Sequence, residues 1–239
     1  MMWPGENGSG AMRPGENKRE FRFFIEKRRL ILALLWLPVY IFILPILLTL
    51  LQNAAPTLSD SYAEFLLQAL SAVYLLAVLF PFLRGEFDNL LEHAGRAVLA
   101  VLGGLFVYFA LGYACTALSL TLVPNAEEIF KAWDAEWAAV DRGPAIAALV
   151  ILAPLTEGLL FRGCVFGLLR KKRRVLAYVV AVAVYVLAQA WWPGVMGAEL
   201  LLGMIQTLPA AVVLCWSYET GRSLWASIFL QMLISAINV

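Results

Sequence analysis

The stretch Ala153-Pro154-Leu155-Thr156-Glu157-Gly158-Leu159-Leu160-Phe161-Arg162-Gly163 places two charged side chains inside an apolar run, Pro144–Leu169. About 20 apolar residues cross the roughly 30 Å hydrocarbon core as a helix, so the run predicts a membrane span. Glu157 lies at a depth of roughly 18 Å from the end of this span, at 1.5 Å per residue. An ionisable group at that depth indicates a functional site. In an α-helix Arg162 points about 140° away from Glu157, so we expect it to extend toward the cytoplasm or to pair with another helix.

The rest of the chain supports a membrane protein. Hydrophobic residues make up 62% of the sequence and charged residues 15%, whereas soluble domains carry about a quarter charged residues. We therefore predict an all-α multi-pass transmembrane bundle. Its seven spans are Leu30–Leu51, Phe65–Leu83, Ala97–Leu122, Pro144–Leu169, Val175–Trp192, Ala198–Tyr218 and Leu224–Val239.

Basic residues predict the orientation of this bundle in the cell membrane. Of the 18 Lys and Arg residues, most fall in segments that share one side, including the run Arg170–Arg174. Because cytoplasmic loops are rich in Lys and Arg, we expect a cytoplasmic N-terminus and an outside C-terminus. The net charge of +1 argues against a nucleic-acid partner.

Three segments outside the spans complete the predicted organisation. Residues 1–17, with a repeated Pro-Gly-Glu-Asn pattern that leaves Met12 as an alternative start, are expected to form a disordered cytoplasmic tail. Residues 18–29 predict a basic helix resting on anionic lipid. Residues 125–141 predict an amphipathic helix outside the membrane, capped by Asn125 with Glu128; it serves as an interfacial helix or as a lid. We divide the chain at 18–143, with the first three spans, and 144–239, a core of four spans.

Further polar side chains fall at a depth similar to that of Glu157. They are Gln189 in the fifth span and Gln231 with Ser235 in the last, where the spacing of four residues places both on one face. Glutamine and serine often serve only as hydrogen bonds between helices. A buried carboxyl group must instead be protonated, paired or hydrated. We therefore expect one interior polar cluster and expect it to open toward the cytoplasmic leaflet.

These residues carry a resemblance to a known family. Residues 153–163 resemble the EExxxR motif of the CPBP family, the CAAX-prenyl-protease-like intramembrane proteases that include bacteriocin self-immunity proteins. Tyr185 to Gln189 match the spacing of the family's FxxxH motif, and Gln231 with Ser235 match a final histidine and asparagine. The resemblance covers roughly residues 144–239. It implies that Glu157, Arg162, Gln189, Gln231 and Ser235 occupy the family's catalytic positions.

The departures from the family pattern concern its chemistry. In the family, the glutamate and the histidines activate a water, with a divalent metal such as zinc. Gly158 replaces the second glutamate, and glutamine replaces both histidines. Glutamine takes no proton near neutral pH and is a poor zinc ligand, so we expect no metal or other cofactor. The single histidine, His93, lies in a predicted loop far from the cluster, and Cys164 is either a small core residue or a thiol on the face of Glu157.

Three functions follow from this pattern. The first is a pseudoprotease that binds a membrane peptide, a lipid, or a prenylated or bacteriocin-like protein without cleaving it, in an immunity or scaffold role. The second is an active endopeptidase with Glu157 as general base. The third is a small transporter in which Glu157 carries protons. Membrane lipids are expected partners in each case.

Overall fold

The computed structural model describes residues 24–54 and 59–238, and within these ranges it contains helices and no strand. The predicted tail at 1–17 and most of the predicted basic helix lie outside the described residues. The helices are α1 (Lys27–Pro38), α2 (Leu44–Ala54), α3 (Asp60–Glu92), α4 (Ala94–Leu122), α5 (Ala126–Ala139), α6 (Arg142–Ile146), α7 (Ala153–Glu157), α8 (Gly167–Arg170), α9 (Arg174–Ala190), α10 (Ala198–Gly221) and α11 (Leu224–Asn238). Three π-helical segments continue the helices on either side of them: η1 (Val39–Ile43), η2 (Ala147–Leu152) and η3 (Gly158–Phe166).

All seven predicted spans are helical, which confirms the all-α membrane bundle. In the described part of the chain, five continuous helices are long and apolar enough to cross a membrane: Lys27–Ala54, Ser61–Glu92, Ala94–Leu122, Arg142–Arg170 and Ala198–Gly221. Two shorter apolar helices, Arg174–Ala190 and Leu224–Asn238, correspond to the fifth and seventh predicted spans. The second span continues to Glu92, well past its predicted end at Leu83.

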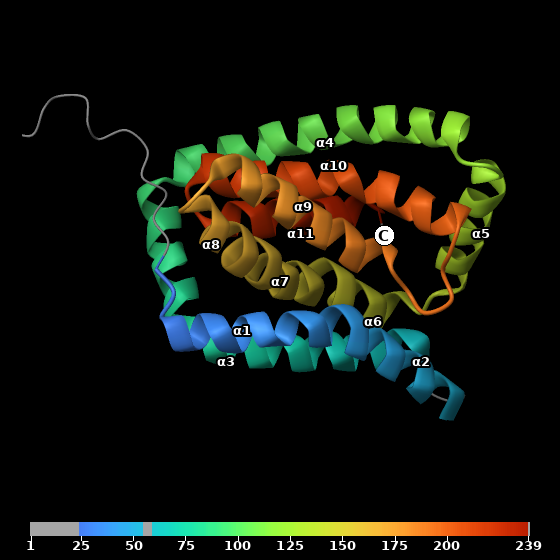
Figure 1. Ribbon diagram of the computed structural model, residues 1–239, viewed down its shortest axis with the longest axis horizontal. Helices are drawn as coiled ribbons and strands as arrows, with labels where there is room; N and C mark the ends of the chain where they lie inside the picture. Colours follow the sequence, from blue (N-terminus) through green and yellow to red (C-terminus); the bar gives the residue numbers. More distant parts are fainter. Residues whose placement is uncertain (1–23, 55–58, 239) are drawn as a thin grey trace, which may run out of the picture.

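The helices run roughly along one axis in three layers (Figure 1). The α1–α2 segment and α3 form one side, α4 forms the other, and α7 to α11 lie between them. Two ends result. We call the end with the loop Lys171–Arg173 the basic end, and the opposite end, which α5 closes, the α5 end.

The helix that carries Glu157 lies at the centre of the protein. In its most apolar window 56% of residues are buried, against 11% for α4, which presents most of its surface outward. Leu159, Leu160 and Phe166 are completely buried, and so is Cys164, which packs among core side chains. The central position explains how a charged side chain of this helix can be enclosed by the other spans.

Prolines explain two of the three π-helical segments. The η1 and η2 segments each end two residues before a proline, Pro45 and Pro154. Proline lacks an N–H and its ring pushes against the carbonyl four residues earlier, so a wider turn relieves the contact. The η3 segment contains no proline but begins at a glycine.

Two local predictions were wrong. The helix at 125–141 forms as α5, but Asn125 has a left-handed backbone (φ 57°) and its side chain makes no cap hydrogen bond. A capping side chain needs an extended backbone to reach back to the helix N–H groups, and this conformation does not provide it. In the predicted helix at 18–29, residues 24–26 are not helical and Lys27 to Arg29 belong to α1, while residues 18–23 lie outside the described residues.

Candidate functional site

The Glu157 carboxylate is enclosed by two other spans. Its side chain is 4% exposed. The Tyr40 hydroxyl of η1 donates to Oε1 at 3.0 Å, and the Gln231 amide of α11 donates to Oε2 at 2.6 Å. Both carboxylate oxygens therefore accept a hydrogen bond from the protein.

Gln231 links this carboxylate to Arg162. Its Oε1 accepts from an Arg162 Nη, while its Nε2 donates to Glu157 and, at 3.3 Å, to the Tyr185 hydroxyl. The positive end of the amide dipole thus faces the acidic group and the negative end faces the guanidinium. An amide in this arrangement connects two opposite charges without carrying one.

Arg162 is the largest fully buried side chain of the described residues, at 1% exposure. Besides Gln231, it donates from Nε to the Ser227 hydroxyl at 3.3 Å, and its Cζ lies 4.9 Å from the centre of the Tyr185 ring. Among the described side chains, no carboxylate forms a direct ion pair with it. We define Tyr40, Glu157, Arg162, Tyr185 and Gln231 as the central cluster.

We expected Arg162 to point away from Glu157, and this was wrong. We also expected Arg162 to pair with another helix, and it does so through α11. Both side chains contact Gln231. The reason is η3, since residues five apart are hydrogen-bonded neighbours in a π-helix, whereas they lie on different faces of an α-helix. The wider turn brings both charged residues of the motif toward α11.

A cavity of about 140 Å³ lies beside Glu157. Its polar lining comes from Tyr40, Glu64, Gln68, Glu157 and Gln189. The Gln68 amide donates to the Tyr40 hydroxyl at 3.2 Å, which makes α3 part of the same network.

The apolar lining shows which way the cavity extends. It consists of Leu44, Pro45, Leu48, Leu67, Leu149, Ala153, Ala188 and Trp192. These residues belong to the α5-end halves of their helices, so the cavity runs from Glu157 away from the basic end. The predicted opening was on the side of the basic run, and the cavity extends toward the other end; which of the two ends is cytoplasmic stays a prediction.

The sequence did not predict the direction in which the cavity extends. The depth of a residue within its span does not show which neighbouring helices cover either half of the site. The α5 helix contributes no residue to the described lining. Its Phe130 and Trp133 instead pack with Leu202 and Ile205 of α10. The structure therefore favours an interfacial helix over a lid.

The remaining predicted site residues occupy different positions. Gln189 lines the cavity and lies within hydrogen-bonding reach of Tyr185. Ser235 is half-buried one turn beyond Gln231, and within the described residues no hydrogen bond joins it to the central cluster. His93 lies at the basic end, with Nε2 3.4 Å from an Arg222 nitrogen.

Sequence reasoning missed Tyr40, Glu64, Gln68 and Tyr185. Gln68 lies within the predicted second span. It could have been found, like Gln189, as a polar side chain inside an apolar run. Glu64 was missed because the predicted span began one residue later. Nothing in the sequence near Tyr40 indicates that its hydroxyl reaches the fourth span.

Gly158 stands where the family has a second glutamate, and its surroundings exclude a larger residue. A Cβ atom at this position would lie 2.7 Å from Cγ1 of Ile228. Real Cβ atoms do not approach other atoms so closely, so the Ile228 side chain, or α11 with it, would have to shift. The packing of Ile228 on this turn thus favours a glycine here.

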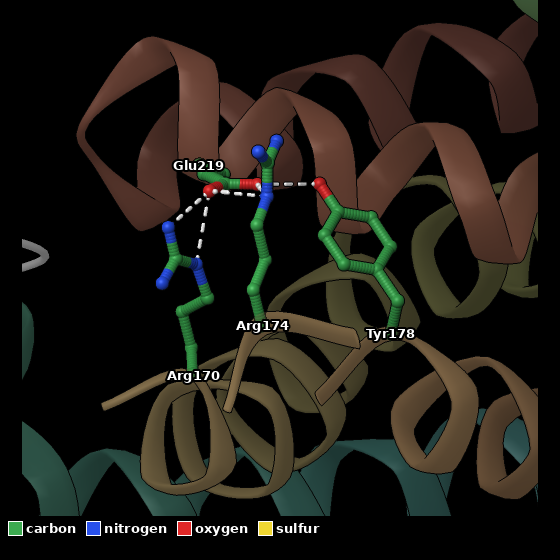
Figure 2. Close-up of polar contacts among 4 residues, drawn as sticks. All are labelled: Arg170, Arg174, Tyr178 and Glu219. Carbon is green, nitrogen blue, oxygen red and sulfur yellow. Dashed lines mark hydrogen bonds and ion pairs between the residues drawn. The ribbon is translucent and has the colours of Figure 1, made fainter. Parts of the chain in front are cut away.

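A second polar cluster lies at the basic end (Figure 2). The Glu219 carboxylate of α10 accepts from Arg170 Nε at 2.9 Å, from Arg174 Nε at 3.2 Å and from the Tyr178 hydroxyl at 2.7 Å. We define these four residues as the Glu219 cluster. It ties the loop between α8 and α9 to the end of α10.

The fold and the central cluster together define a CAAX-protease-like membrane protein. Residues 141–237 match the family model described as Type II CAAX prenyl endopeptidase Rce1-like. This C-terminal part of the chain is accordingly similar to the CAAX-protease-like proteins of the CPBP family. No curated protein and no solved structure shows a significant match to the chain.

The residues around Glu157 do not fit the zinc ion that the family implies. Zinc takes thiolate, imidazole and carboxylate ligands in tetrahedral arrangement. The groups around Glu157 are tyrosine hydroxyls, glutamine amides and one further carboxylate, Glu64, so among the described residues the site offers no imidazole and no thiolate. In the described part of the chain, no three His, Cys, Asp or Glu side chains gather in a metal-binding arrangement.

Proposed function

We propose that this protein is a non-hydrolytic member of its family, which binds part of a membrane peptide or lipid in the cavity beside Glu157 without cleaving it. The observation that carries the proposal is that Gln231, at the position of a family histidine, hydrogen-bonds Glu157 and Arg162 simultaneously. Three of the motif residues are thus bonded in a chain, while one Nη of Arg162 has no hydrogen-bond partner among the described residues.

Hydrolysis would require Glu157 to take a proton from water. General bases act on a water within hydrogen-bonding distance and pass its proton on. Glu157 already accepts from Tyr40 and Gln231, and a glutamine amide cannot take a proton near neutral pH. The chemistry of the side chains supports binding over catalysis.

The volume of the cavity matches one polar group of a ligand better than a whole ligand. About 140 Å³ is smaller than the roughly 300–1,000 Å³ of sites that enclose a drug-sized molecule. A single side chain or a small polar head fits beside Glu157, while an attached apolar chain would lie along the apolar lining. A role as an immunity protein or a scaffold, in which a membrane substrate is held and not cut, agrees with this size.

A cleavage assay tests the proposal. The purified protein in proteoliposomes is incubated with prenylated and bacteriocin-like peptides, and products are detected by mass spectrometry. We expect no cleavage by the wild type or by Glu157→Gln. Cleavage that disappears in Glu157→Gln but persists in Glu64→Gln, a matched carboxylate of the same cavity, would establish an active endopeptidase instead.

Metal content tests the same proposal independently. We expect the purified wild type to contain no zinc and the double variant Gln189→His/Gln231→His to take it up, because imidazole supplies the missing ligands. The single variant Gln206→His, in a polar contact between α4 and α10, is the control and should remain free of zinc. Stoichiometric zinc in the wild type would contradict the proposal.

A further inference from the structure

The Glu219 cluster fixes part of the basic run. Glu219 holds Arg170 on one side and Arg174 on the other, so the loop between them is anchored at both ends. Arg174 is bonded through Nε, and its two terminal nitrogens extend past the carboxylate (Figure 2). Its side chain is 61% exposed. The guanidinium therefore keeps two donors directed outward.

The loop carries a large excess of positive charge. Lys171, Lys172 and Arg173 are all exposed. Within the described residues, no ion pair involves any of these three side chains, whereas Arg170 and Arg174, which flank them, pair with Glu219. The three exposed cations therefore lie together on the surface of this loop.

An apolar groove begins directly at these charges. It is lined by Arg173, Arg174, Val175, Leu176 and Val179. Val175 is 76% exposed and Val179 61%, and their spacing of four residues places them on one face of α9. The opposite face of the helix, with Ala177 and Ala181, is buried in the bundle. The groove therefore lies on the outer surface of the bundle, with cationic groups at one end and aliphatic side chains along the rest.

We propose that this groove binds one anionic phospholipid. The headgroup phosphate accepts hydrogen bonds from the guanidinium groups of Arg173 and Arg174, which match phosphate oxygens in geometry and charge. The first part of an acyl chain lies against Val175, Leu176 and Val179. A lipid is favoured over an acidic peptide because the apolar half of the groove belongs to a short apolar helix whose Val175 and Val179 side chains are exposed, and these suit an acyl chain. This inference is independent of the proposed function.

Lipid retention tests the site. The full chain in detergent is mixed with phosphatidylglycerol or phosphatidylcholine of identical acyl chains, and bound lipid is counted by native mass spectrometry. We expect the wild type to retain one phosphatidylglycerol in preference to phosphatidylcholine. Arg173→Gln should weaken this retention at least about fivefold, because it removes hydrogen bonds between the guanidinium and the charged phosphate.

The matched control is Lys172→Gln, which removes the same charge from the same loop but not from the groove. It should change retention by less than about twofold, because screened charges outside the site contribute little. Equal losses in the two variants, or equal retention of the two lipids by the wild type, would overturn the proposal. Val179→Gln tests the acyl contact and should also reduce retention. Displacement of the lipid by inorganic phosphate at equal concentration would show that the apolar part contributes nothing and would also overturn it.

Discussion

The central cluster and the Glu219 cluster use the same types of side chain at two depths in the membrane. Each contains a carboxylate, an arginine and a tyrosine. At the basic end Arg170 contacts Glu219 directly, and Arg174 remains largely exposed. In the centre Glu157 and Arg162 are both buried, and Gln231 stands between them.

The difference follows from the surroundings of the charges. Near water, an ion pair gains little because both partners are solvated when apart. In the interior, burying a charge costs several kcal/mol unless its hydrogen-bonding groups are satisfied. Gln231 satisfies one group on each charge and simultaneously connects α11 to the fourth span. The comparison teaches that the loss of one hydrogen-bonding partner costs more free energy where water cannot replace it.

The largest effect is expected for Gln231→Leu. This change leaves Glu157 and Arg162 without their shared partner, and a buried charge that loses its partner costs about 3–5 kcal/mol. The free energy of unfolding in detergent, from titration with dodecyl sulfate, measures the loss.

The control for this variant is Gln206→Leu. Gln206 accepts from Thr116 and donates to Ser119, so it joins α10 to α4 through neutral groups alone. Its loss should cost about 0.6–2 kcal/mol, as for other hydrogen bonds between membrane helices. Equal losses of unfolding free energy in the two variants would show that the charges of Glu157 and Arg162 add nothing to the cost of removing Gln231.

A smaller effect is expected for Tyr40→Phe. The change removes the hydroxyl that donates to Glu157 and accepts from Gln68, and keeps the ring. Hydrogen bonds to charged groups contribute about 1.5–3 kcal/mol. The same titration measures the effect, with Tyr74→Phe as control, because the Tyr74 hydroxyl bonds only the Leu32 carbonyl, in an exposed position. A loss no larger than that of the control would mean that Tyr40 is not part of the central cluster's energetics.

The smallest effect is expected for Glu219→Gln. The ion pairs of this cluster are partly exposed, so their loss should cost at most about 1 kcal/mol. The cost should shrink further between about 0.05 M and about 1 M salt, because the ions screen exposed charges. Thermal unfolding at the two salt concentrations measures this. A large loss of stability that does not depend on salt would show that the Glu219 cluster behaves as a buried cluster, like the central cluster.

The sequence predicted what depends on composition and length. Runs of apolar residues located the seven predicted spans, and the cost of burying polar groups selected Glu157, Arg162 and Gln231, which the structure brings into contact. Tyr40 and Glu64 escaped because a tyrosine counts as apolar and because a span boundary fell one residue late. The side to which the cavity extends depends on how α1 to α3 pack against α7 and α9, and no local pattern records that packing. The conformation of Asn125 was missed for a related reason, since its residue type suits both a cap and a left-handed turn.

The π-helical segment η3 has a consequence for the spacing between the two clusters. Each residue of an α-helix turns the chain by about 100°. A π-helical turn contains more residues than an α-helical turn, so each residue of η3 turns the chain by less. Removing one residue between Gly158 and Phe166 would tighten this turn and rotate everything after it. Glu157 would keep its place while Arg170 swung away from Glu219. The number of residues in η3, and not only their identity, therefore determines how Arg170 is rotated about the helix axis relative to Glu157.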